Sequence, residues 1–158
     1  MLDKMSFFHT FKSELIWYLI SLVLCLVILF PIYYFEVDYG FWWVNAIFIF
    51  GLSVFTRWIF LWKYTPFAWW MYYKVILAFL MIPLFFWTMY AYAGFKDFVN
   101  EIGIQEILKE VPVQDQMALA KYIQNQITFF AVGFMICILI IPFKMIYSIW
   151  MQFNRGTV

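Results

Sequence analysis

Charge is scarce in this sequence. Only 12% of its 158 residues are Asp, Glu, Lys or Arg, whereas soluble domains average about 25%. Hydrophobic residues make up 67% of the chain and aromatic residues 26%. We therefore predict an all-α integral membrane protein. With about 20 apolar residues needed for each crossing, the length allows four spans and one modest loop, and it leaves no room for a soluble catalytic domain.

Histidine and cysteine are almost missing as well. His9 is the single histidine, which excludes haem held by two histidines of one chain and histidine-rich zinc sites. Cys25 and Cys137 both fall in apolar runs, so neither a disulfide framework nor a thiolate metal site is expected. Nucleophile motifs, glycine-rich phosphate loops and paired carboxylates are also lacking. We expect no catalytic residue, no metal and no cofactor.

Acidic residues are confined to the ends of the apolar runs and to the segments between them. Ion-driven transporters keep an ionisable acid inside the membrane to bind the coupling ion. The polar groups inside these runs are instead neutral: Ser21, Asn45, Ser53, Thr56 and Thr88. This pattern counts against an ion-coupled transporter acting alone, although it leaves a pore open. A basic tail is lacking too, so nucleic acid is not an expected partner.

What the sequence does contain is four long apolar runs. They predict spans at about residues 15–35, 41–62, 67–94 and 127–150, within a single membrane domain that covers residues 1–158. A polar segment, 95–126, separates the third and fourth spans. Its apolar residues recur at helical spacing opposite its charges. We therefore predict an amphipathic helix on the outer face, broken at Gly103 and ended by Pro112.

Lysine and arginine are distributed unequally between the two sides that these spans define. The side with both termini has two acids, Asp3 and Glu14, and seven Lys or Arg residues: Lys4, Lys12, Arg57, Lys63, Lys74, Lys144 and Arg155. The opposite side has seven acids and three lysines: Lys96, Lys109 and Lys121. By the positive-inside rule, both termini are predicted to be cytoplasmic, in the inner membrane of a prokaryote.

The stretch Arg57–Lys74 joins the second and third spans with a dense mixture of cations and aromatic rings. Trp and Tyr favour the headgroup level of a membrane, where Lys and Arg reach anionic lipids. We therefore expect an inner cationic ring that contacts an anionic lipid headgroup or a partner: Arg57, Lys63, Lys74 and Lys144. Arg57 is the strongest candidate, because its planar fork suits a phosphate or carboxylate. The alternative is that these cations only anchor the spans.

Small residues in the spans predict where helices approach closely, because packing rather than hydrophobicity drives helix association in lipid. The candidates are Ser21, Cys25, Gly51, Gly133 and Cys137. Cys25 and Cys137 share a depth near the midplane, counted at 1.5 Å per residue. We therefore expect the first and fourth helices to cross there. The competing interpretation is that one small face meets a partner or a second copy.

The composition favours an interaction protein over a catalyst. The chain has 21 Phe, nine Trp and eleven Tyr residues, more aromatic surface than four helices need to pack together. We predict an accessory or scaffold subunit of a larger inner-membrane assembly, in contact with membrane lipids and with other subunits or copies of itself. The alternative is a homo-oligomeric pore or small transporter. A lipid-modifying membrane enzyme is the third possibility, and it would need acid and base groups at the cytoplasmic face.

Overall fold

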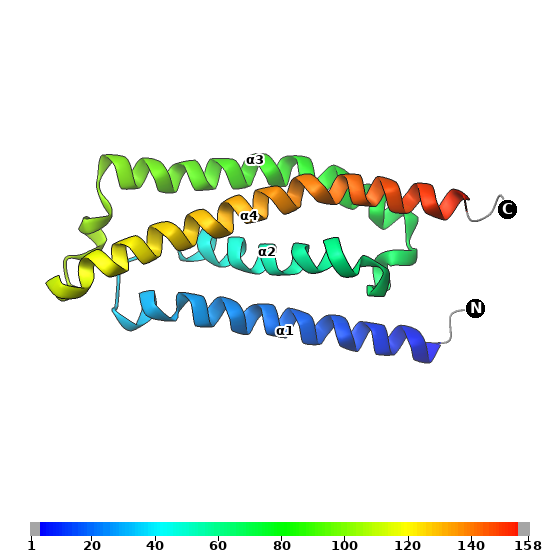
Figure 1. The fold of residues 1–158 in the computed structure, drawn as a ribbon, viewed down its shortest axis with the longest axis horizontal. Helices are drawn as coiled ribbons and strands as arrows, with labels where there is room; N and C mark the ends of the chain where they lie inside the picture. The colour runs from blue at the N-terminus through cyan, green and yellow to red at the C-terminus, as the bar shows by residue number, and fades with distance from the viewer. Residues whose placement is uncertain (1–3, 155–158) are drawn as a thin grey trace.

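The computed structural model describes residues 4–154, with the side chains of residues 4–10, 66 and 69 left out. Four long helices follow one another along the chain: α1 (Lys4–Tyr34), α2 (Trp42–Leu61), α3 (Met71–Glu101) and α4 (Val113–Asn154). Two short 3-10 turns, η1 (Trp62–Tyr64) and η2 (Pro66–Trp69), connect α2 to α3, and a third, η3 (Ile104–Leu108), lies between α3 and α4. The described residues thus form helices joined by short turns, with no strand among them, as predicted (Figure 1).

All four long helices are long and apolar enough to cross a membrane. The prediction of four apolar spans is thus confirmed, and the chain has the architecture of a multi-pass membrane protein. Three helices extend beyond the predicted spans, and α3 does so by ending at Glu101 rather than at residue 94. Helix α1 begins at Lys4 rather than at residue 15, and α4 begins at Val113 and continues without interruption through the polar residues that precede the fourth span.

The helices lie nearly side by side, with α2 between α1 and α4, and α3 against α4 (Figure 1). Helix α1 buries one narrow stripe: Glu14, Ser21, Cys25, Leu29 and Ile32. This spacing of three, four or seven residues is that of a coiled-coil seam, which meets its neighbour along a single line. Most of the remaining surface of α1 is exposed and apolar. Helix α1 is therefore attached to the bundle chiefly through α2.

The bundle has two distinct ends (Figure 1). The hairpin end, as we call it, carries the start of α1, the turns η1 and η2, and the end of α4. The loop end carries the α1–α2 turn, η3 and the start of α4. Helix α2 connects the two ends, and its 20 residues extend about 30 Å at 1.5 Å per residue. That length matches the hydrocarbon core of a bilayer.

The polar segment between the third and fourth spans differs from its prediction. A separate amphipathic helix is not formed: α3 continues to Glu101, Gly103 reverses the chain at a φ of 87°, and only the short turn η3 follows. Glycine adopts this backbone conformation without the clash that a Cβ would cause. Three apolar residues of the segment, Ile104, Leu108 and Val111, are buried against the loop end of the bundle. They cover the core there instead of forming one face of a helix.

Candidate functional site at the hairpin end

The four cations of the predicted ring are placed in three different environments. Arg57 is buried in an ion pair, Lys144 is bonded to a backbone carbonyl, and Lys63 and Lys74 line a pocket. The structure therefore does not bring them together as one ring. Arg155 and Asp3, which the charge count also used, lie outside the described residues.

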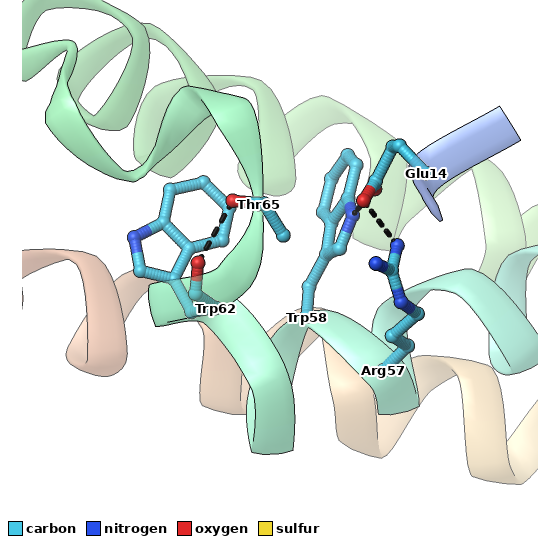
Figure 2. Close-up of polar contacts among 5 residues, drawn as sticks. All are labelled: Glu14, Arg57, Trp58, Trp62 and Thr65. Atoms are coloured by element: carbon cyan, nitrogen blue, oxygen red, sulfur yellow. Dashed lines mark hydrogen bonds and ion pairs between the residues drawn. The ribbon is translucent and has the colours of Figure 1, made fainter. Parts of the chain in front are cut away.

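Arg57 on α2 pairs with Glu14 on α1 (Figure 2). Its guanidinium NH1 contacts Glu14 Oε2, and the indole N–H of Trp58 donates to Glu14 Oε1 at 3.3 Å. The Arg57 Cζ also lies 5.4 Å from the centre of the Trp17 ring. Both charged side chains are at least nine-tenths buried. Arg57 is thus occupied within the chain rather than open to an external phosphate, and its buried Nε has no partner among the described residues.

Lys144 on α4 donates to the backbone carbonyl of Ile59. Ile59 lies in the last turn of α2, where the final four carbonyls of a helix lack intrahelical partners. A cation is also favoured there by the helix dipole. Lys144 therefore holds the end of α2 against α4.

Lys63 and Lys74 line a pocket of about 370 Å³ at the hairpin end, together with Trp62, Ser148 and Gln152. Lys74 is 2% exposed, and its Nζ donates to Gln152 Oε1 at 2.9 Å. Lys63 is exposed, with its Nζ 4.8 Å from the centre of the Tyr64 ring. The pocket thus brings together two cations from different elements, Lys63 from η1 and Lys74 from α3.

The corner between η1 and η2 fixes the position of Trp62. Thr65 is 1% exposed, and its hydroxyl donates to the Trp62 carbonyl at 2.8 Å while its backbone N–H donates to the same oxygen at 3.0 Å (Figure 2). The Trp62 ring also stacks with that of Tyr73, at a centroid distance of 6.3 Å. The indole nitrogen of Trp62 is buried and has no hydrogen-bond partner among the described residues. In Figure 2 it points away from both Trp58 and Thr65.

A second polar cluster lies near the loop end. Asn45 on α2 and Gln126 on α4 exchange two hydrogen bonds, Asn45 Nδ2 to Gln126 Oε1 at 2.9 Å and Gln126 Nε2 to Asn45 Oδ1 at 2.7 Å. Asn45 Nδ2 also donates to the Tyr39 hydroxyl at 3.2 Å. All three side chains are buried. Burial raises the pKa of the Tyr39 phenol, and the bond from Asn45 offsets part of that rise. This amide clamp joins α2 to α4 with neutral groups only.

The small residues mark contacts with α2, not a crossing of α1 with α4. A Cβ on Gly51 of α2 would collide with the Phe134 ring of α4, and one on Gly133 would meet Leu52. Cys137 Sγ lies 3.6 Å from Thr56 Oγ1, and Cys25 Sγ lies 3.8 Å from the Ala46 carbonyl. Ser21 is buried in the seam of α1. The expected crossing is therefore wrong: α2 lies between α1 and α4, and Cys25 and Cys137 contact it ten residues apart, at Ala46 and Thr56, so they do not share a depth.

Helix α1 does reach α4 at one point near the loop end. The hydroxyl of Tyr122 on α4 donates to the carbonyl of Ile28 on α1 at 2.7 Å.

No group of three or more His, Cys, Asp or Glu side chains able to hold a metal lies among the described residues, and the side chain of His9 falls outside them.

Sequence reasoning missed the burial of Glu14 and the role of Trp62. Glu14 heads the regular stripe that continues through Ser21 and Cys25, so its spacing was a usable signal. Trp62 carried no such signal, since its environment depends on the turn that Thr65 fixes.

No known protein family, curated protein or solved structure matches this chain.

Proposed function

We propose that the chain is a non-catalytic accessory or scaffold subunit of a larger protein assembly in a prokaryotic inner membrane. The direction in which its polar side chains point supports this proposal. Those in the spans mostly face inward and bond to one another, as in the Glu14–Arg57 pair and the Asn45–Gln126 clamp. The outward faces of the helices are apolar and rich in aromatic rings, with Phe79 70% exposed and Tyr90 81% exposed on α3.

This arrangement favours a scaffold over a pore built from several copies. A pore needs polar side chains that face away from each bundle and toward a shared axis. Here the amides Asn45 and Gln126 are buried between α2 and α4 within one chain. Large rings on the outside offer packing surface, which is what drives helix association in lipid. The narrow seam of α1 leaves most of its circumference available to a neighbour.

We further propose that the hairpin end faces the cytoplasm. The charged residues at this end whose side chains the structure describes are Glu14 and five cations: Lys12, Arg57, Lys63, Lys74 and Lys144. The loop end carries Glu36, Asp38, Asp97, Glu101, Glu106, Glu110 and Asp115 against three lysines. The excess of Lys and Arg at one end supports this orientation under the positive-inside rule.

Site-specific photo-crosslinking tests the scaffold proposal. A photoreactive phenylalanine at Phe79 or at Leu26, which is 62% exposed on α1, should form an adduct with one defined membrane chain in stoichiometric amount. The same residue at Phe48, which is fully buried, is the matched control and should form none. Adducts at twice the mass of this chain support the pore instead. Adducts with lipid alone at both exposed positions contradict the scaffold.

A further inference from the structure

The pocket at the hairpin end contains hydrogen-bond donors that its described residues satisfy only in part. Lys74 uses one of its three ammonium protons on Gln152. The Trp62 indole N–H is buried and unpaired among the described residues, and Lys63 adds a second positive charge at the mouth. Of the described residues that line this pocket, none is acidic. A buried donor left unpaired destabilises the folded state, so the pocket favours an occupant that supplies negatively charged oxygens.

The size and lining of the pocket limit the occupant to a small amphipathic group. Its volume of about 370 Å³ lies at the lower end of the range for ligand sites. Ala68 and Met151 provide apolar surface beside the cations, and the Ser148 hydroxyl provides a further polar contact. A phosphate group that carries a short apolar chain can contact both the cationic and the apolar residues of the lining.

The position of the pocket indicates where such a group comes from. The pocket lies where η1 meets the ends of α3 and α4, at the level of exposed rings that include Tyr64, Trp70 and Tyr72. Rings of this kind settle at the headgroup level of a bilayer, and lysines at the same level attract anionic lipids. We propose that this pocket binds the phosphate of an anionic phospholipid headgroup, with Lys74 and the Trp62 N–H as ligands and Lys63 as the outer cation. The site belongs to the single chain and does not depend on an assembly partner.

Native mass spectrometry of the purified full chain in mild detergent tests this site. The probes are phosphatidylglycerol, phosphatidylcholine as the zwitterionic comparison, and inorganic phosphate. Phosphatidylglycerol should bind at least tenfold more tightly than phosphatidylcholine. Lys74→Met and Trp62→Phe should each weaken phosphatidylglycerol binding about tenfold, since each removes a donor and keeps much of the side-chain volume.

Two further variants keep the test decisive. Lys63→Met changes an exposed side chain, so it should weaken binding threefold or more even if the buried substitutions prevent folding. Lys121→Met removes an exposed lysine at the loop end and should leave binding unchanged. Equal affinity for the two lipids, or equal losses in Lys63→Met and Lys121→Met, would overturn the proposal. Binding of inorganic phosphate with the same variant dependence, without selectivity between the lipids, would also overturn it in favour of a free phosphate.

Discussion

The buried polar groups near the two ends of α2 differ in how fully they are hydrogen-bonded. Near the loop end, Asn45 and Gln126 exchange two hydrogen bonds, and the cluster is neutral. Near the hairpin end, Arg57 pairs with Glu14, but the Arg57 Nε and the Trp62 Nε1 have no hydrogen-bond partner among the described residues. Asn45 and Arg57 are twelve residues apart on one helix, which is about 18 Å at 1.5 Å per residue.

This difference distinguishes a cluster that serves helix packing from one that is suited to bind a ligand. In the amide clamp the donors and acceptors satisfy one another, so no unpaired group is left to attract a ligand. Removing the clamp should affect only the packing of α2 against α4. A cluster with surplus donors attracts an anion, because a buried polar group without a partner destabilises the folded state. The hairpin end therefore carries the candidate site, and the loop end serves the fold.

The largest effect is expected at the Glu14–Arg57 pair. Arg57→Met leaves a buried carboxylate without its cation, which should lower the free energy of unfolding by about 3–5 kcal/mol. The double variant Glu14→Leu/Arg57→Met should recover most of that loss, because it removes both charges together. Unfolding in detergent followed by circular dichroism measures each value.

The exposed pair Lys109–Glu106 at the loop end is the matched control. Lys109→Met should change the free energy of unfolding by less than about 1 kcal/mol, because solvent screens exposed pairs. If Arg57→Met is as mild as Lys109→Met, the ion pair does not hold α1 to α2.

A smaller effect is expected at the amide clamp. Asn45→Leu or Gln126→Leu alone leaves one buried amide without its partner, and each should cost about 1–2 kcal/mol in the same unfolding experiment. The double variant Asn45→Leu/Gln126→Leu should recover most of that loss, since it leaves neither amide behind and only the Tyr39 hydroxyl loses a donor. A double variant as unstable as the sum of the two single variants would show that the amides do not stabilise the fold through each other.

The spans were predictable because each apolar run is long enough to cross a bilayer and is bounded by charges or turn residues. The break at Gly103 was also visible in the sequence, although the helix expected beyond it was not formed. The stripe that buries Glu14 could have been found from its spacing with Ser21 and Cys25.

The neighbours of each helix could not be predicted in the same way. Small residues occur on α1, α2 and α4 alike, so their depth does not say which pair meets. Lys144 bonds to the Ile59 carbonyl across 85 residues of sequence, and this contact depends on α4 lying beside the end of α2. The surplus donor on Trp62 depends on the turn that Thr65 stabilises. Both features follow from tertiary packing.

We propose that the hairpin end faces the cytoplasm and the loop end the opposite side of the membrane, and cysteine labelling in intact cells tests this most directly. Lys63→Cys and Glu106→Cys each place a thiol at an exposed position, one at each end. The wild-type chain gives the background, because Cys25 and Cys137 are buried. With a membrane-impermeant maleimide, Glu106→Cys should be labelled in intact cells and Lys63→Cys only after permeabilisation. Labelling of Lys63→Cys in intact cells, or protection of Glu106→Cys until permeabilisation, would contradict the account.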